Sequence, residues 1–243
     1  MASTQTLVLI GSGPMIGVSA ASLFATRKFS NIALISRDAT RLSNDRDSVL
    51  AAAKAAGKDL TIRTFATDIK NTPAFEKVLE EVETMGHISA VVFNAARVGP
   101  SELFKFPEEE IIEDFKVCLH PRYHVIKRLT FSTQTTTIAT YTAARWAMPL
   151  LAQETDSPSF LVTSGLLHND PIPILFSLGV AKAAQRTLVL TLQRMYPEIH
   201  VALLLISGVV GFEEEVRNPA NIAEELWKLY SQEKKEWAVE VTM

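Results

Sequence analysis

Short apolar segments alternate with helix-forming segments along almost the whole chain of 243 residues, which restricts the possible folds more than any other feature. The apolar segments are nearly continuous in Val, Ile, Leu and Ala, as is typical of parallel strands covered on both faces. Parallel strands need crossover connections, so the pattern predicts an α/β fold with a doubly wound parallel sheet. We expect the strands at residues 6–10, 32–36, 61–66, 90–94, 160–164, 201–206 and 237–241.

Two Xaa-Pro pairs mark helix starts between these strands. Thr72 followed by Pro73 predicts an N-cap and a proline at the first helical position, and Asn218 with Pro219 gives the same signal for the last helix. No repeat, low-complexity tract or linker interrupts the chain. We therefore expect a single domain over residues 1–243.

Composition excludes several classes of function. A net charge of −3 and a pI near 6.0 give no reason to expect nucleic acid or an anionic membrane as partner. The chain has one cysteine, Cys118, which excludes an internal disulfide and favours a reducing, cytoplasmic compartment. The apolar run 7–10 has no basic segment before it and is too short for a signal peptide or a membrane span. The histidines show no metal-ligand spacing, so we expect no metal.

A glycine-rich turn follows the first expected strand. Residues 11–17 read Gly-Ser-Gly-Pro-Met-Ile-Gly, and a helical pattern begins directly after them. Glycines at such a turn let the backbone approach a pyrophosphate at a helix N-terminus, as in dinucleotide-binding Rossmann-type folds. A tight strand-to-helix turn without a ligand is the alternative interpretation. We predict that this turn binds the cofactor through Gly11, Ser12, Gly13, Ile16 and Gly17.

The segment 176–184, Phe-Ser-Leu-Gly-Val-Ala-Lys-Ala-Ala, resembles the active-site helix of the short-chain dehydrogenase/reductase (SDR) family. That family carries Tyr-x-x-x-Lys here, and this chain has Leu178 in place of the tyrosine and Lys182 as the lysine. The turn also resembles the family's Gly-x-x-x-Gly-x-Gly, with Met15 at the middle glycine. The resemblance implies a Rossmann fold and a nicotinamide cofactor. It also implies an atypical catalytic site, because leucine cannot donate a proton.

Further positions carry over from the same resemblance. Arg37, at the end of the second strand, implies a preference for NADP(H), since a basic residue there can pair with a 2′-phosphate. Asp68 corresponds to the aspartate beside the adenine, and Asn94 to the asparagine that braces the sheet and lines the cofactor. Val209 lies in the loop that flanks the nicotinamide. The resemblance also makes Ser164 a catalytic residue that binds the substrate carbonyl, and it gives Lys182 both a catalytic role and a role in binding the ribose.

Two features depart from the family pattern. The proton donor that replaces the tyrosine is open, and His168 in the loop after the fifth strand is one candidate. Residues 117–134 interrupt a helix that otherwise matches, with Thr136 at the position of the family's asparagine. Their ends can be encoded by intron boundary sequences, so we interpret them as a non-native insert from a translated intron. A basic surface loop is the alternative.

These features predict an NADP(H)-dependent, SDR-like oxidoreductase that acts on a carbonyl or alcohol of a small metabolite. If the insert is a fungal intron, secondary metabolism is a natural setting. One alternative is a non-redox enzyme on the same scaffold, such as an isomerase, dehydratase or cyclase. The other is a catalytically inactive cofactor-binding or partner subunit. Family resemblance also implies a homo-oligomer, a dimer or a tetramer.

Overall fold

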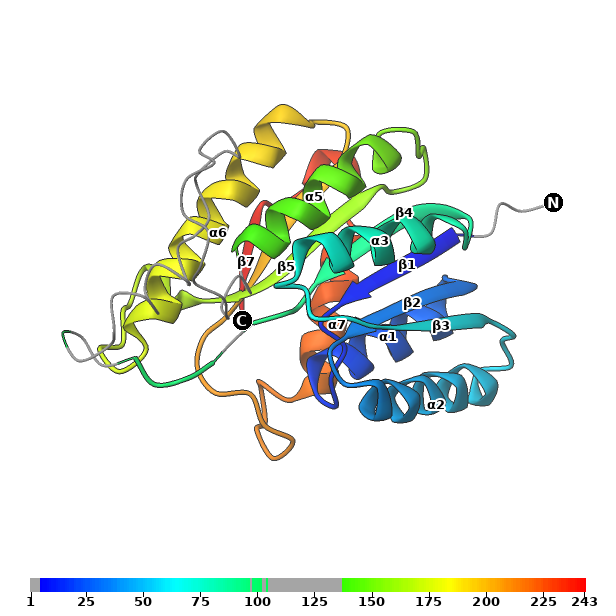
Figure 1. The fold of residues 1–243 in the computed structure, drawn as a ribbon, viewed down its shortest axis with the longest axis horizontal. Helices are drawn as coiled ribbons and strands as arrows, with labels where there is room; N and C mark the ends of the chain where they lie inside the picture. The colour runs from blue at the N-terminus through cyan, green and yellow to red at the C-terminus, as the bar shows by residue number, and fades with distance from the viewer. Residues whose placement is uncertain (1–4, 97, 102–103, 105–136) are drawn as a thin grey trace.

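Seven strands form one parallel sheet in the order β3-β2-β1-β4-β5-β6-β7 (Figure 1). The computed structural model describes residues 5–96, 98–101, 104 and 137–243. All pairings within this sheet are parallel, which confirms the predicted doubly wound α/β fold. The strands are β1 (Gln5–Ile10), β2 (Asn31–Ser36), β3 (Thr61–Ala66), β4 (His87–Phe93), β5 (Ser159–Gly165), β6 (His200–Ile206) and β7 (Glu240–Thr242).

Six α-helices of the described ranges cover the two faces of the sheet. Three of them begin at a side-chain cap, where Asp38, Asn71 and Asn218 each accept a hydrogen bond from a backbone N–H three residues ahead. The cap of the third helix is therefore Asn71, and the prediction of Thr72 as N-cap was wrong by one residue. The helices are α1 (Ile16–Arg27), α2 (Ala39–Ala55), α3 (Thr72–Glu83), α5 (Thr137–Leu151), α6 (Phe176–Met195) and α7 (Pro219–Tyr230).

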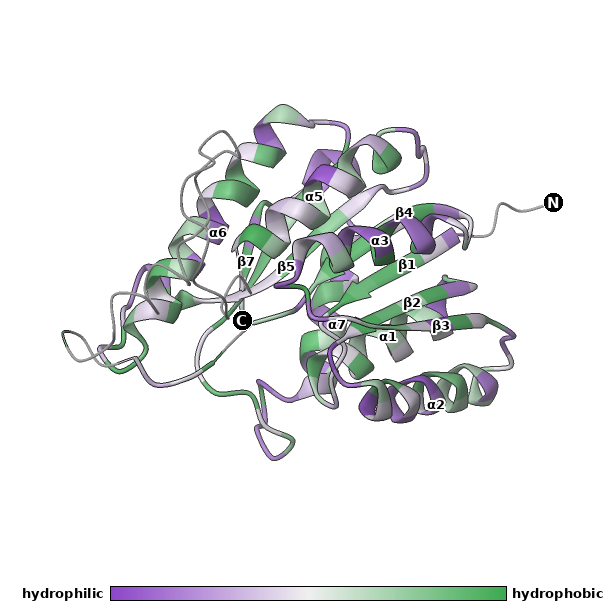
Figure 2. Cartoon of the chain, viewed as in Figure 1, coloured by the Kyte–Doolittle hydropathy of each residue, from purple (hydrophilic) through white to green (hydrophobic). Residues whose placement is uncertain are grey.

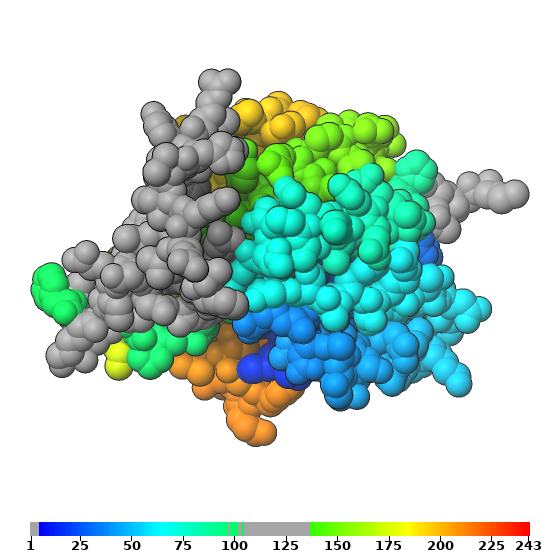
Figure 3. Space-filling view, in the orientation of Figure 1, coloured from blue at the N-terminus to red at the C-terminus, as the bar shows by residue number. Residues whose placement is uncertain are grey.

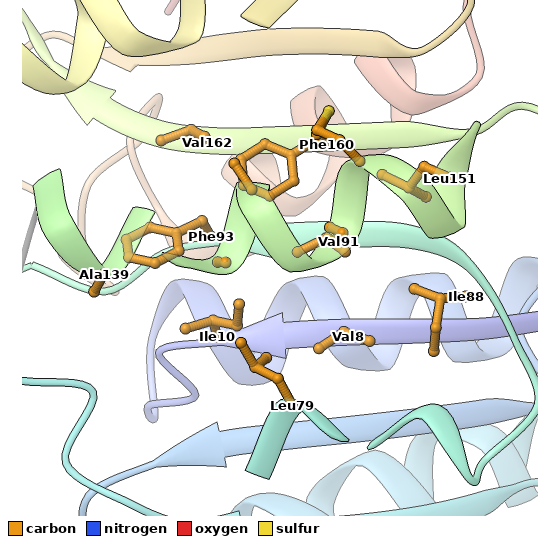
Figure 4. Close-up of a cluster of buried hydrophobic side chains, with 14 of the residues drawn as sticks. Val8, Ile10, Leu79, Ile88, Val91, Phe93, Ala139, Leu151, Phe160 and Val162 are labelled. Carbon is orange, nitrogen blue, oxygen red and sulfur yellow. The ribbon is translucent and has the colours of Figure 1, made fainter. Parts of the chain in front are cut away.

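Alternate residues of each central strand enter two separate cores. Val8 and Ile10 of β1 pack with α3, α5 and α6, whereas Leu7 and Leu9 pack with α1, α2 and α7. Figure 4 shows the first of these cores, and Figure 2 shows apolar colouring on the strands with polar colouring on the outer helices. The central strands are thus buried on both faces, which explains why their sequences are mostly apolar, whereas the edge strand β3 is partly exposed.

The C-terminal strand starts later than the sequence suggests. We expected it at 237–241, but a short 3-10 turn at Lys234–Glu236 precedes it and β7 begins at Glu240. Trp237 is diverted from the ladder because its ring stacks on His200 at 4.9 Å and its indole N–H donates to the Gln232 carbonyl. Pairing with β6 starts only at Val239, whose carbonyl accepts from the Leu203 N–H.

The strand order reverses between β1 and β4, and all strands end at the same edge of the sheet. In folds of this kind ligands bind outside the carboxyl ends of the strands at this reversal. A dark-blue part of the N-terminal region is visible at the surface between α2 and the orange segment that follows β6 (Figure 3). None of the helices in the described ranges combines the length and apolarity that a bilayer crossing requires.

Candidate functional site

A cavity of about 210 Å³ lies where β1, β2, β3 and β4 end. It occupies the position that the strand reversal predicts for a ligand. Four of the predicted cofactor-binding residues line it. Its lining consists of Gly11, Ser12, Ile35, Ser36, Arg37, Arg41, Thr67, Ile69, Asn94, Ala95 and Ala96.

The glycine-rich turn forms the floor of this cavity, and two of its glycines are sterically required. Gly11 has φ +94°, and a Cβ there would lie 2.5 Å from the Ala95 backbone nitrogen on β4's extension. A Cβ on Gly17 would lie 3.0 Å from the Gly11 carbonyl oxygen. Gly13, by contrast, faces open space, and Met15 is not among the residues that line the cavity.

Helix α1 begins directly behind this turn, at Ile16. Its N-cap residue, Met15, makes no side-chain hydrogen bond to the helix N-terminus. The free N–H groups and the dipole of a helix N-terminus favour an anion such as a pyrophosphate. Ser12 is buried, and its hydroxyl donates to a carboxylate oxygen of Asp45 at 2.7 Å, which ties the turn to α2. The turn is therefore held in place before any ligand binds.

Two arginines stand at the end of β2. Arg37 is exposed, whereas Arg41, one turn into α2, is half-buried and donates through Nη2 to the Ser36 hydroxyl at 2.6 Å. The Arg41 Nε is buried and has no hydrogen-bond partner in the described part of the chain. The nearby carboxylate of Asp38 accepts the Arg41 backbone N–H as the cap of α2. The cavity thus offers two guanidinium groups to a ligand, while the adjacent Asp38 carboxylate is used as the cap of α2.

Asp68 does not line the cavity. Its side chain is exposed and accepts from the Lys70 backbone N–H at 3.1 Å, while its neighbours Thr67 and Ile69 face the cavity. The predicted contact between Asp68 and an adenine therefore stays a prediction. Val209 is also outside the cavity lining, and its side chain is exposed in the loop after β6.

Asn94 joins three strand ends at the cavity wall. Its amide nitrogen donates to the Gly11 carbonyl at 3.0 Å, and its amide oxygen accepts from the Thr163 hydroxyl at 2.8 Å. The Asn94 backbone N–H also donates to the Ile10 carbonyl. The side chain thus braces β1, β4 and β5, which agrees with the structural part of its expected role.

The expected catalytic positions lie at the end of β5 and the start of α6. Ser164 is buried, and its hydroxyl has no hydrogen-bond partner among the residues that the structure describes. A buried hydroxyl without a partner is free to bind an incoming polar atom, such as a carbonyl oxygen. Leu178 is buried one helical turn before Lys182 on α6. The ring of His168 lies over the Gly165 carbonyl, with Nδ1 at 3.2 Å from the oxygen.

The Lys182 ammonium points into the protein interior. Its Nζ donates to the Gln185 side-chain oxygen at 2.9 Å and to the Thr163 carbonyl at 3.3 Å. Gln185 in turn donates to the Thr140 hydroxyl at 2.9 Å. Burial lowers the pKa of Lys182 from 10.5 to about 8, because desolvation penalises the charged form. The lysine is not among the residues that line the cavity.

A family model agrees with this fold and site. The model for the KR domain matches residues 5–147, which is more than half of the chain. The chain therefore belongs to the KR domain family, within the short-chain dehydrogenases/reductases. The search of curated proteins found no match. The match ends before α6, so the correspondence of Leu178 and Lys182 with the family's tyrosine and lysine stays a prediction.

Solved structures share the whole architecture of this SDR protein at low sequence identity. A short-chain dehydrogenase from Rhodopseudomonas palustris is 19% identical with a TM-score of 0.75, covering 99% of this chain and 98% of its own. An alcohol dehydrogenase from Thermococcus sibiricus, complexed with 5-hydroxy-NADP, is 20% identical with a TM-score of 0.77 and coverages of 98% and 96%. An NADPH-bound short-chain oxidoreductase from Pseudomonas aeruginosa, described as containing an atypical catalytic center, is 17% identical with a TM-score of 0.79 and coverages of 99% and 95%.

The structure adds site residues that the sequence did not reveal. Arg41 repeats the chemistry of Arg37 one helical turn later, so the spacing was available as a signal. Gln185 gave no such signal, because its partner Thr140 is 45 residues away in the chain. Within the described ranges, no three His, Cys, Asp or Glu side chains gather as a metal site would require. Thr136 and the segment 117–134 lie outside the described residues.

Proposed function

We propose that this SDR protein is an NADP(H)-dependent oxidoreductase that acts on a carbonyl or alcohol group of a small metabolite. The observation that carries the proposal is the pair Arg37 and Arg41 in the cavity at the end of β2. Within the described ranges the Arg41 Nε is a buried donor without a partner, and a 2′-phosphate oxygen would satisfy it. Two of the structural neighbours hold NADP-type ligands, which supports the same cofactor here.

The residues present fit such a cofactor. The uncapped start of α1 leaves backbone N–H groups for a pyrophosphate, while the N–H groups of Gly11 and Ser12 already donate to the Ile35 carbonyl. A bound nicotinamide would supply or accept the hydride. In our proposal the glycine-rich turn holds the phosphates, Asn94 shapes the wall, Ser164 binds the substrate oxygen, and Val209 lies beside the nicotinamide. Lys182 contributes a positive charge behind the wall.

Leu178 makes proton transfer the weak point of this proposal. A leucine neither donates nor accepts a proton, and the Lys182 ammonium is turned inward rather than toward the cavity. These two observations favour a second candidate function, a cofactor-binding protein without turnover or a non-redox enzyme on the same scaffold. If the protein is an oxidoreductase, the proton comes from water or from His168 beside the substrate.

Binding and turnover separate these candidates. Titration of the unmutated protein should show NADPH binding at least several-fold more tightly than NADH, and Arg37→Ala should reduce this preference. Oxidation of NADPH should then be followed with a panel of ketones and aldehydes. Turnover supports the oxidoreductase. Selective binding of NADPH without turnover supports the second candidate. Equal affinity for the two cofactors would refute the assignment of the two arginines.

The proposal also includes a cellular location, an oligomeric state and a metabolic setting. We propose a cytoplasmic location from the single cysteine in the sequence. A homo-oligomer follows from family resemblance, and size-exclusion chromatography with light scattering tests it. We propose a role in fungal secondary metabolism only if residues 117–134 are derived from an intron, so the test of the intron hypothesis also tests this role.

A further inference from the structure

A series of hydrogen bonds, bridged at Thr163 by the covalent bonds between its carbonyl and its hydroxyl, links the protein interior to the wall of the nucleotide cavity. It starts at the Thr140 hydroxyl on α5 and passes through Gln185 to the Lys182 ammonium on α6. The ammonium donates to the carbonyl of Thr163, whose hydroxyl donates to Asn94 on the cavity wall. The last hydrogen bond of the series runs from the Asn94 amide nitrogen to the Gly11 carbonyl in the glycine-rich turn.

Gln185 is the most deeply buried amide in this series of hydrogen bonds. Its side chain is fully buried, and an amide is seldom fully buried unless its polar atoms are satisfied. Both ends of the amide are used, because the oxygen accepts from Lys182 and the nitrogen donates to Thr140. These two bonds fix the orientation of the amide, so that its oxygen faces the ammonium.

No charged side chain in the described ranges balances the Lys182 ammonium. Burial is the sole cause of its lowered pKa. The titratable groups on the elements packed around Lys182 have other partners or are exposed. Arg186 pairs with Glu240, and Arg145 pairs with Glu76. His168 lies at the Gly165 carbonyl and His200 at the Ala238 carbonyl, while Arg194 and Tyr141 are exposed. Neutral oxygens of Gln185 and Thr163 therefore supply the stabilisation.

We propose that Gln185, braced by Thr140, is a positioning residue that holds the Lys182 ammonium against the Thr163 carbonyl, behind the nucleotide cavity. Gln185 thereby stabilises the protonated amine and keeps the positive charge at a fixed place behind Asn94. A side chain with no acceptor at this position favours the neutral amine. The effect on the amine is a property of the protein alone, while its effect on NADPH rests on the proposed function.

The test is a titration of Lys182 in the full-length protein without cofactor. Lysine labelled with ¹³C at Cε is followed by NMR, and the Lys182 resonance is assigned by its loss in Lys182→Met. Gln185→Met keeps the length of the side chain but removes the acceptor, and should weaken proton binding by Lys182 about 10- to 100-fold. Gln185→Glu places a carboxylate beside the ammonium and should strengthen proton binding by at least as much.

Gln193→Met is the matched control, since it makes the same change about two turns further along α6, where the side chain is only half-buried. It should leave the Lys182 titration unchanged. Thr140→Val removes the brace and should weaken proton binding in the same direction as Gln185→Met. If Gln185→Met fails to fold, the Gln185→Glu variant, which is nearly identical in shape, decides alone.

Opposite shifts in the Met and Glu variants support the proposal. A Lys182 titration that stays within about twofold in both variants overturns it, even if the melting temperature falls, because a merely structural glutamine would lower stability alone. NADPH affinity against pH is measured in parallel. If the Lys182 titration moves but the pH dependence of NADPH affinity does not, the role of Gln185 stands and the cofactor role of Lys182 fails.

Discussion

Replacement of Arg41 by methionine tests the nucleotide cavity most directly. In the free protein the change removes one hydrogen bond, from Nη2 to the Ser36 hydroxyl. It also removes a buried Nε that has no partner in the described part of the chain. A hydrogen bond to a charged group contributes about 1.5–3 kcal/mol, and an unsatisfied buried donor costs about 1–3 kcal/mol. These effects offset each other, so the free energy of unfolding should change by no more than about 1 kcal/mol.

The effect on the cofactor should be much larger. If Arg41 pairs with a 2′-phosphate, its loss removes a charge-assisted hydrogen bond of about 1.5–3 kcal/mol, which corresponds to about 10- to 100-fold in Kd for NADPH. NADH has no 2′-phosphate and should bind as before. Arg46→Met is a suitable control, because Arg46 lies on the same helix but is exposed and pairs with Asp47. This control should change neither cofactor affinity nor stability.

Fluorescence titration with NADPH and NADH measures the affinities, and urea unfolding of the free protein measures the stability. The expected result combines a large selective loss of NADPH affinity with an almost unchanged unfolding free energy. If NADPH affinity is unchanged, Arg41 does not contact the 2′-phosphate. If the affinities for NADPH and NADH fall together and the free energy of unfolding also falls, Arg41 has a structural role in α2.

Three residues and one segment carry the remaining predictions. Leu178→Tyr places a hydroxyl one turn before Lys182 and should raise ketone reduction by about 10²-fold or more if the proposed oxidoreductase lacks a proton donor, whereas no gain favours the non-redox candidate. Lys182→Met should raise the melting temperature of the free protein and weaken NADPH binding, measured by thermal unfolding and titration. Burial lowers the pKa of His200 below its ordinary 6.5, so the unfolded chain binds that proton more strongly. Stability should therefore fall as the pH drops from 7 to 5, and His200→Gln should flatten this dependence in denaturant unfolding at each pH. Transcript sequencing should show the codons for 117–134 removed by splicing, and their presence in mature messages would contradict the intron hypothesis.

The fold was predictable because its strands are buried on both faces. A strand such as β1 is apolar over its core residues, Leu7 to Ile10, and that pattern is visible without knowledge of any neighbour. Boundaries were less predictable, because they depend on local competition. Asn71 takes the cap that Thr72 was expected to take, and Trp237 leaves the ladder for a contact with His200. The cap follows the stronger N-cap preference of Asn over Thr, whereas the position of Trp237 depends on a contact with a residue far away in the sequence.

The site was predictable only where its residues form a local motif. Gly11 and Asn94 occupy positions fixed by the ends of their own strands, and the structure brings them within hydrogen-bond distance. The hydrogen-bond partners of Lys182 in the described part of the chain come from two elements, β5 and α6, and only one of them, Gln185, is close in sequence. The resemblance indicated a lysine at this position, but the inward direction of its ammonium depends on packing of α5 against α6.

A buried ammonium without a carboxylate partner destabilises the fold that contains it. The folded pKa of about 8 lies below the ordinary 10.5, so the unfolded chain holds the proton more strongly than the folded protein does. Below pH 8 this difference opposes folding by about 3 kcal/mol, and the penalty disappears as the pH rises above 10.5. An apolar side chain at position 182 would avoid that penalty, and the neighbouring Ser164 likewise buries a hydroxyl that no group in the described part of the chain satisfies. Two such costs at the ends of β5 and α6, beside a cavity that fits a phosphate-bearing nucleotide, are typical of a binding site whose polar groups are held ready for a ligand. The chain therefore carries more polar chemistry behind this cavity than its fold needs.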